Sequence, residues 1–314
     1  MDLEHLNRLV REEQAFWKNI THYHNTTMKD LPFLARVVAE RYTALTINQI
    51  DKISDPRTSK WPLIETPIPT VVIVLMYLYI VLWLGPRIMA NRKPFKLKEV
   101  LIVYNAAQVL FSLYMFYEHL ASGWFWDYSF KCQPVDYSAN EKAMRMAKLC
   151  WIYYVSKLTE LADTIFFVMR KKDSQISFLH VYHHSLTPLE TWFLTRFIAG
   201  GHGTLQNLIN NLVHTILYFY YMVAAMGPEY QKYIWWKKHL TTIQLIQFVI
   251  VFFHAAQLMT NDCGYPKLMA YGIMIQSVIF FSLFSNFYYQ SFIKPRTVKK
   301  PVENGTEKKT IKAE

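Results

Sequence analysis

The amino-acid sequence predicts an all-α membrane protein that crosses the bilayer as seven helices. Of its 314 residues, 52% are hydrophobic and only 18% are charged. Apolar runs of about 20 residues, the length a helix needs to cross a bilayer, recur along most of the chain. The charged residues gather between these runs. This distribution overrules the one or two soluble domains that the length alone would suggest.

Seven apolar runs are long enough to span the membrane, and together they form a membrane domain over residues 69–292. The spans are about 69–89, 100–120, 147–169, 179–198, 205–226, 240–260 and 267–292. Residues 1–68 form a tail before the first span, in which residues 31–50 form either an amphipathic helix on the membrane surface or a short soluble helix. Residues 293–314 form a basic tail that we expect to be disordered.

Basic residues indicate the orientation of the spans, because loops on the cytosolic side are rich in Lys and Arg. Most of them follow spans one, three and five or lie in the C-terminal tail. We therefore expect a cytosolic C-terminus and an N-terminus on the opposite side.

The N-terminal stretch MDLEHLNRLVREEQAFWKN lacks an apolar core and does not resemble a signal peptide. The net charge of +11 mostly reflects this topology, and nothing indicates nucleic acid as a partner.

Two further features agree with this orientation. Asn19 and Asn25 begin glycosylation sequons in the N-terminal tail. Cys132 and Cys263 fall in two loops assigned to the same oxidising side, whereas Cys150 lies within span three. This placement is compatible with a disulfide between Cys132 and Cys263, although the sequence does not show that they come within bonding distance.

Four spans direct polar residues to one region, at mid-depth and toward the cytosol. They are Lys157, Glu160 and Asp163 in span three, His180, His183 and His184 in span four, Asn211, His214, Tyr218 and Tyr221 in span five, and Thr241, Gln244 and Gln247 in span six. A charge at the bilayer centre costs roughly 2.5–3.5 kcal/mol, so this concentration indicates a functional site. Hydrogen bonding between helices is the alternative, which we prefer for Asn210, Gln276 and Asn286.

The three histidines of HVYHH, residues 180–184, suggest a metal as the first alternative. Membrane di-iron desaturases and hydroxylases use HxxHH boxes, but they use several such boxes and more histidines than the five that are left within the membrane when those on or near its two surfaces are set aside. Those five are His180, His183, His184, His214 and His254. They are too few for that di-iron centre, while a single zinc ion held by three histidines stays an alternative.

A receptor or a transporter would share a similar topology. The DRY and NPxxY signatures of rhodopsin-like receptors are absent, and a receptor would leave the histidines unexplained. The sequence shows no internal repeat of the kind found in many transporters. Imidazole is both a nucleophile and a proton carrier near neutral pH. Acid–base and nucleophilic catalysis on a lipid therefore fits the histidine cluster best.

The motifs, taken in order, resemble those of the very-long-chain fatty acid elongases, membrane-bound condensing enzymes of the endoplasmic reticulum. KLTELADT (157–164) fits the family pattern KxxExxDT, and HVYHH fits HxxHH. TTIQLIQ (241–247) fits TxxQxxQ, and HTILYFYY (214–221) fits HxxMYxYY except that Leu217 replaces the methionine. The similarity runs from about residue 55 to the end of span seven and includes segments typical of animal and insect members.

The resemblance implies seven helices, six of them around a tunnel for the acyl chain, in the endoplasmic reticulum membrane. The implied reaction condenses a long-chain acyl-CoA with malonyl-CoA into a 3-ketoacyl-CoA two carbons longer, carbon dioxide and free CoA. The enzyme would be a very-long-chain 3-oxoacyl-CoA synthase, an acyltransferase without a metal or organic cofactor. A ketoacyl-CoA reductase, a hydroxyacyl-CoA dehydratase and an enoyl-CoA reductase would be partners, and a homodimer is one option for the oligomeric state.

The resemblance also implies roles for the residues. His183, the second histidine of its box, would carry an acyl-imidazole intermediate, since the motifs contain no cysteine. The other members of the catalytic group would be His180, His184, His214, Asp163, Glu160 and Lys157. Residues that bind substrate or stabilise an enolate would be Gln244, Gln247, Asn211, Tyr218, Tyr221 and Thr241. The CoA phosphates would meet Arg170, Lys171, Lys172, Lys237 and Lys238.

Overall fold

The computed structural model describes residues 51–294, and every regular element of that range is helical. The chain divides into two units, Met1–Ser54 and Asp55–Glu314, and the second contains helices α3 to α11. The interfacial helix predicted in the N-terminal tail, the sequons at Asn19 and Asn25, and the disorder predicted for the C-terminal tail all lie outside the described residues.

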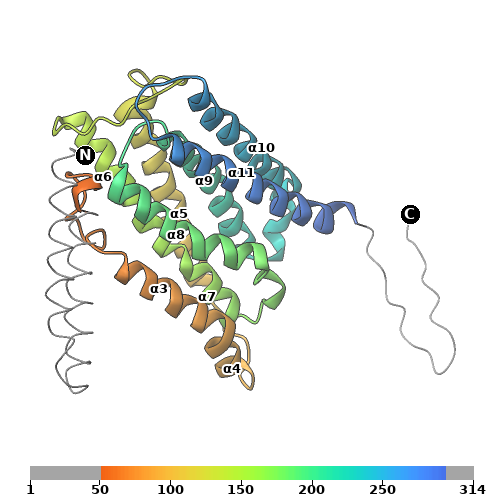
Figure 1. The fold of residues 1–314 in the computed structure, drawn as a ribbon. Coiled ribbons are helices and arrows are strands. Elements are labelled where there is room, and N and C mark those ends of the chain that lie inside the picture. Colours follow the sequence, from red (N-terminus) through yellow and green to blue (C-terminus); the bar gives the residue numbers. More distant parts are fainter. Residues whose placement is uncertain (1–50, 295–314) are drawn as a thin grey trace, which may run out of the picture. The chain divides into compact units, whose positions relative to one another are not determined.

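Helices follow one another along the second unit (Figure 1). They are α3 (Ile68–Tyr79), α4 (Gly85–Met89), α5 (Lys98–His119), α6 (Glu141–Thr159), α7 (Leu161–Met169), α8 (Phe178–Phe197), α9 (Thr204–Met226), α10 (Lys237–Ala256) and α11 (Lys267–Tyr288). π-Helical turns extend three of them, namely η2 (Ile80–Leu84), η3 (Leu120–Trp124) and η7 (Tyr289–Ile293). Short 3₁₀ helices are η4 (Asp173–Gln175), η5 (Pro228–Tyr233) and η6 (Gln257–Met259).

Five helical segments are long and apolar enough to cross a membrane, which identifies a multi-pass membrane protein. They are Ile68–Met89, Lys98–Trp124, Thr204–Met226, Lys237–Met259 and Lys267–Ile293. Each lies within a few residues of a predicted span. Helices also occupy the other two predicted spans, as α6 with α7 and as α8. These helices carry Lys157, Glu160 and the three clustered histidines, so they lack the apolar composition of the five.

The helices turn polar faces inward and apolar faces outward. In α5 the buried side chains include Asn105, Gln108 and Ser112, whereas Val103 and Leu110 are exposed. Neighbouring helices satisfy such polar groups, while exposed apolar side chains suit contact with lipid tails. The pairs α5 with α9, α10 with α11, and α6 with α8 pack along one another (Figure 1). The interior of this unit is therefore more polar than its outer surface.

A break separates α6 from α7 at Glu160. The hydroxyl of Ser156 donates to the carbonyl oxygen of Tyr153. The hydroxyl of Thr159 donates to the backbone carbonyl oxygen of Ser156. Such side-chain bonds to nearby backbone compete with the hydrogen bonds of a regular helix. The predicted span 147–169 is therefore two helices, and the residue at their junction is a carboxylate of the candidate site.

The segment before α3 is attached to the bundle through the buried side chain of Arg57. The Arg57 guanidinium lies 2.6 Å from the carboxylate of Asp55, and both side chains are almost fully buried. The same guanidinium donates to the carbonyl oxygens of Ala143 in α6 and Ala199 after α8. These bonds satisfy a charge that would be costly to bury alone, and they fix α6 and α8 side by side at this end.

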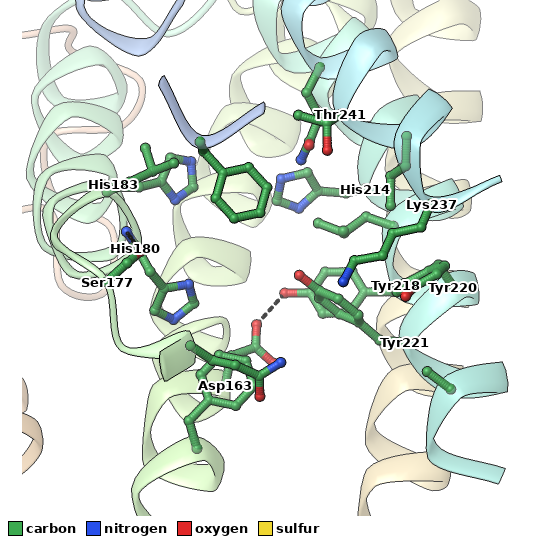
Figure 2. Close-up of a pocket in the computed structure, with 18 of the residues that line it drawn as sticks. Asp163, Ser177, His180, His183, His214, Tyr218, Tyr220, Tyr221, Lys237 and Thr241 are labelled. Carbon is green, nitrogen blue, oxygen red and sulfur yellow. Dashed lines mark hydrogen bonds between the residues drawn. The ribbon is translucent and has the colours of Figure 1, made fainter. Parts of the chain in front are cut away.

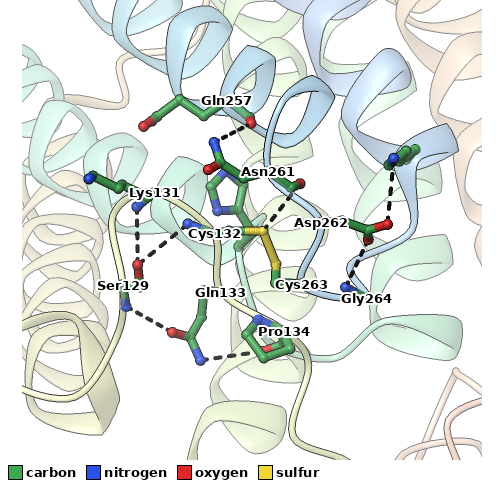
Figure 3. Close-up of a disulfide and its surroundings, with 12 residues drawn as sticks. Ser129, Lys131, Cys132, Gln133, Pro134, Gln257, Asn261, Asp262, Cys263 and Gly264 are labelled. Atoms are coloured by element: carbon green, nitrogen blue, oxygen red, sulfur yellow. Dashed lines mark hydrogen bonds and ion pairs between the residues drawn. A yellow bond between two sulfur atoms is a disulfide. The ribbon is translucent and has the colours of Figure 1, made fainter.

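A disulfide joins Cys132, in the loop between α5 and α6, to Cys263, in the loop between α10 and α11 (Figure 3). The two Cα atoms are 5.9 Å apart, within the usual range for a disulfide. Close by, the Gln257 side-chain amide donates to the carbonyl oxygen of Phe130. The end of the α10–α11 hairpin is thus attached covalently to the rest of the bundle, and Cys150 is a buried free thiol.

Removing this disulfide should lower stability, because it links residues 131 positions apart. We expect Cys132→Ser to lower the free energy of unfolding by about 2–4 kcal/mol, the usual value for a bridge that closes a long loop. The measurement is the thermal unfolding of detergent-solubilised protein, with Cys150→Ser as the control that leaves the bridge intact. Equal stability of Cys132→Ser and wild type would contradict this expectation.

Candidate active site

A cavity of about 790 Å³ opens among α5, α7, α8, α9, α10 and α11. Thirteen residues predicted for the site line it. They are Asp163, Arg170, Lys172, His180, His183, His184, His214, Tyr218, Tyr221, Lys237, Thr241, Gln244 and Gln247. Its basic residues come from the C-terminal end of α7 and the N-terminal end of α10, so they gather at one end of the bundle. The volume lies within the roughly 300–1,000 Å³ typical of small-molecule sites.

Five predicted residues do not line the cavity, namely Lys157, Glu160, Asn211, Lys171 and Lys238. The side chain of Asn211 is buried and lies 3.4 Å from the imidazole Nδ1 of His119 in α5. Lys171 donates to the carbonyl oxygen of Ala90, and the ammonium of Lys238 lies 5.6 Å from the ring centre of Tyr288. Of the five basic residues predicted to meet phosphates, the structure therefore brings Arg170, Lys172 and Lys237 to the cavity.

The histidine cluster occupies the first turns of α8. Ser177 caps the helix, because its hydroxyl accepts from the backbone N–H of His180. The ring centres of His180 and His184 lie 4.3 Å apart, and those of His183 and His184 lie 5.0 Å apart. Spacings of three and four place these rings on one helix face, as expected. Figure 2 shows His180 and His183 on one side of the cavity and His214 of α9 opposite them.

His180 is held by a chain of hydroxyl groups from two other helices. Its Nε2 atom lies 2.9 Å from the hydroxyl of Thr164 in α7, which in turn lies 2.9 Å from the hydroxyl of Tyr77 in α3. A hydrogen-bonded chain of this kind orients an imidazole and selects its tautomer. Tyr77 was not predicted, since it lies in an apolar run without a polar partner nearby in the chain.

Lys157 and Glu160 form a buried network with α9. The ammonium donates to the Glu160 carboxylate across 2.8 Å and to the Asn210 side-chain oxygen across 2.9 Å. The hydroxyl of Tyr153 donates to that same oxygen. His214 Nδ1 lies 3.2 Å from the Glu160 carboxylate, close enough for an ion pair but not aligned as a hydrogen bond. Asn210, predicted only to hold helices together, also lines the cavity.

Asp163 accepts a hydrogen bond of 2.7 Å from the hydroxyl of Tyr218, the bond drawn in Figure 2. The ring of Tyr104 in α5 meets that of Tyr218 edge-on, with the centres 6.2 Å apart. Gln108 donates to the hydroxyl of Tyr104. Tyr104 was not predicted, but the buried polar residues of α5, among them Asn105, are a signal in the sequence that this helix faces the site.

Several buried polar atoms around the cavity have no hydrogen-bond partner within residues 51–294. They include His184 Nδ1, Glu160 Oε2 and the side-chain oxygen of Gln247. Buried polar groups in native proteins almost always have partners. Groups of this kind that border a cavity are suited to bind a ligand, so the site offers hydrogen-bonding capacity toward a bound molecule.

The described residues contain no group of three or more His, Cys, Asp or Glu placed to hold a metal ion. The arrangement they do provide is a row of imidazoles, carboxylates that can orient them, amide donors on α10, and cationic side chains at one end of the cavity. Imidazoles beside oriented carboxylates can act as nucleophiles or general bases. The cationic end can bind phosphate.

Comparison with known proteins gives a consistent result. The family model described as ELO: GNS1/SUR4 family matches residues 62–300. A Drosophila melanogaster protein named very long chain fatty acid elongase 7 is 51% identical over 265 residues, 84% of this chain and 78% of that protein. A Rattus norvegicus protein of the same name is 51% identical over 256 residues, which are 81% of this chain and 91% of the rat protein.

A Homo sapiens protein named very long chain fatty acid elongase 1 is 46% identical over 257 residues, 81% of this chain and 92% of that protein. The match therefore covers the membrane helices and every motif described above. The chain belongs to the ELO family, together with the very long chain fatty acid elongases.

Proposed function

We propose that this protein is the condensing enzyme of a fatty acid elongation cycle. It would join a long-chain acyl-CoA to malonyl-CoA and release a 3-ketoacyl-CoA two carbons longer, carbon dioxide and CoA. The observation that carries the proposal is the cavity lined by His183, His214 and a cationic end, in a chain whose relatives are named very long chain fatty acid elongases. The relatives supply the substrate class, and the cavity supplies groups suited to the chemistry.

The cationic end of the cavity would bind the phosphates of CoA. Arg170, Lys172 and Lys237 line it, and helix α8 begins there with its N-terminus. A helix N-terminus and cationic side chains both favour an anion. The pantetheine arm would then direct the thioester toward His183, while the acyl chain would lie in the interior of the helix bundle.

In the first step, a ring nitrogen of His183 would attack the thioester carbonyl carbon. The carbon–sulfur bond would break, CoA would leave as a thiol after taking a proton, and an acyl-imidazole would remain. Malonyl-CoA would then lose carbon dioxide, and the carbon of the resulting enolate would attack the acyl carbonyl and release the imidazole. Side-chain amides of Gln244 and Gln247 line the cavity and would stabilise the enolate oxygen. This sequence of steps needs no metal or organic cofactor.

The proposed topology places all seven predicted spans across the endoplasmic reticulum membrane, with six around the acyl tunnel. The C-terminus would be cytosolic and the N-terminus lumenal. Both disulfide loops would then face the oxidising lumen, where such a bond persists. A ketoacyl-CoA reductase, a hydroxyacyl-CoA dehydratase and an enoyl-CoA reductase would act on the product in turn, since the 3-keto group must be removed before another round.

A covalent acyl-enzyme is the most direct test of the reaction. Acyl-CoA alone should release one CoA per enzyme and add the acyl mass to the protein, and malonyl-CoA should then remove it. His183→Ala should abolish the adduct and lower turnover on the order of 10³-fold or more. The measurement is intact-mass spectrometry, with Cys150→Ser as the control that keeps the adduct. An adduct that is lost in Cys150→Ser, or missing from active wild type, would rule out His183 as nucleophile.

The hydrogen bond between Tyr218 and Asp163 should matter for turnover rather than for acylation. Tyr218→Phe removes it and should lower kcat roughly ten- to a hundredfold, the value of a hydrogen bond to a charged group. Adduct formation in the absence of malonyl-CoA should persist. Tyr230→Phe, an exposed tyrosine, is the control. Equal kcat values for Tyr218→Phe and wild type would show that this bond plays no part in catalysis.

Glycosylation tests the orientation. Asn19 and Asn25 should carry glycans, whereas Asn304, in the sequon NGT of the C-terminal tail, should not, because oligosaccharides are added on the lumenal side. An endoglycosidase should therefore shift the gel mobility of wild type but not of the Asn19→Gln/Asn25→Gln variant. A shift that depends on Asn304 would reverse the proposed topology.

A further inference from the structure

A second, smaller pocket lies beyond His183 and extends the main cavity into the bundle. Its volume is about 40 Å³. His183 and Phe248 are among the residues that line both spaces, so the two meet at the histidine cluster. The inner pocket adds Glu190 from α8 and Gln276 from α11. An acyl chain that starts at His183 and extends away from the cationic end therefore enters this pocket.

A hydrogen bond between Glu190 and Gln276 joins two walls of the inner pocket. The Gln276 amide donates to the Glu190 carboxyl group across 2.5 Å, which connects α11 to α8. Glu190 follows His183 by seven residues, so it shares the same helix face and lies about 10 Å farther along the axis. The pair thus lies where the middle of a long acyl chain attached at His183 would pass.

The inner pocket is too small for the distal part of a long chain. A single water molecule needs roughly 10–15 Å³ of such space, so about 40 Å³ holds only a few atoms. The next pocket measures about 20 Å³ and shares Thr191 and Leu194 with it. The walls must therefore move apart before a long chain can lie there, and the Glu190–Gln276 bond opposes that movement.

The attachments of the α10–α11 hairpin suit such a movement. At its far end Cys263 is bonded covalently to Cys132, and the His202 ring donates to the carbonyl oxygen of His254. Toward the middle of α11, the polar link to α8 within the described residues is the bond from Gln276. Separation of Gln276 from its partner would therefore let α11 move away from α8 while the far end stays attached.

We propose that the Glu190–Gln276 pair determines which acyl chains the enzyme accepts, an inference that rests on the proposed condensing activity. Chains that end before Glu190 leave the pair intact. Longer chains separate it inside the membrane. The Gln276 amide then loses its acceptor, and the Glu190 carboxyl group keeps Gln206 as its remaining partner, which is costly. The cost falls on long chains alone, so the pair lowers kcat/KM beyond a certain chain length.

The test compares chain lengths in the full-length enzyme with and without the pair. Glu190→Met/Gln276→Met keeps the side-chain lengths and replaces the polar groups with flexible apolar ones. The measured quantity is the ratio of kcat/KM for a very-long-chain saturated acyl-CoA to kcat/KM for a medium-chain acyl-CoA. We expect this ratio to be roughly two- to tenfold higher in the double variant than in wild type, which corresponds to the ordinary free energy of one hydrogen bond. Glu190→Gln still accepts a hydrogen bond from Gln276, so this matched control should keep the wild-type ratio.

Each outcome decides one question. An unchanged or lower ratio in the double variant would overturn the role of the pair while leaving the condensing activity in place. Wild-type enzyme that condenses no acyl-CoA of any length would instead overturn the proposed function. If the double variant does not fold, Gln276→Ala removes one partner and enlarges the pocket, and its ratio must rise for the inference to stand.

Discussion

The ion pair between Lys157 and Glu160 constrains the rest of the candidate site. Their side chains are only 2% and 3% exposed, in a bundle whose outer surface is apolar. Charges at such a position need both a counter-charge and further hydrogen bonds. Asn210 of α9 supplies one of these bonds, and His214 comes within 3.2 Å of the carboxylate. The register of α9 against α6 is therefore fixed at the level of the histidines by polar contacts, in addition to apolar packing.

The helices themselves follow from the apolar pattern. Helices occupy each of the seven expected ranges, and α6 and α7 share one of them. Regular hydrogen bonding is what satisfies a backbone within a bilayer, so apolar runs of this length predict helices. The break at Glu160 could not be predicted in this way, since KLTELADT keeps an uninterrupted helical spacing. It coincides with bonds from the hydroxyls of Ser156 and Thr159 to nearby carbonyl oxygens. Those bonds depend on side-chain rotamers, which a hydropathy pattern does not specify.

Thirteen of the predicted site residues line the cavity, but spacing along the helices could not choose between neighbouring residues. Asn210 and Asn211 differ in direction by about 100° around α9, and the polar stripe of that span is wide enough to include either. Contact with α5 determines which of the two faces the cavity. Asn211 lies against His119 of α5, while Asn210 accepts a hydrogen bond from Lys157. Lys171 is a related case. Its backbone φ of 52° and its bond to Ala90 direct the side chain away from the cavity.

The α10–α11 hairpin connects the stability of the bundle to its proposed chemistry. Its far end is held by the disulfide and by the bonds of Gln257 and His254 to the loops that precede α6 and α9. These attachments set the height of α10 in the bundle, so Gln247 reaches both the main cavity and the inner pocket at the level of His183. Helix α11, held to α8 by Gln276, forms the opposite wall. One hairpin thus aligns the amides with the histidines at fixed depth, while the space for the acyl chain that we propose would depend on how closely α11 approaches α8.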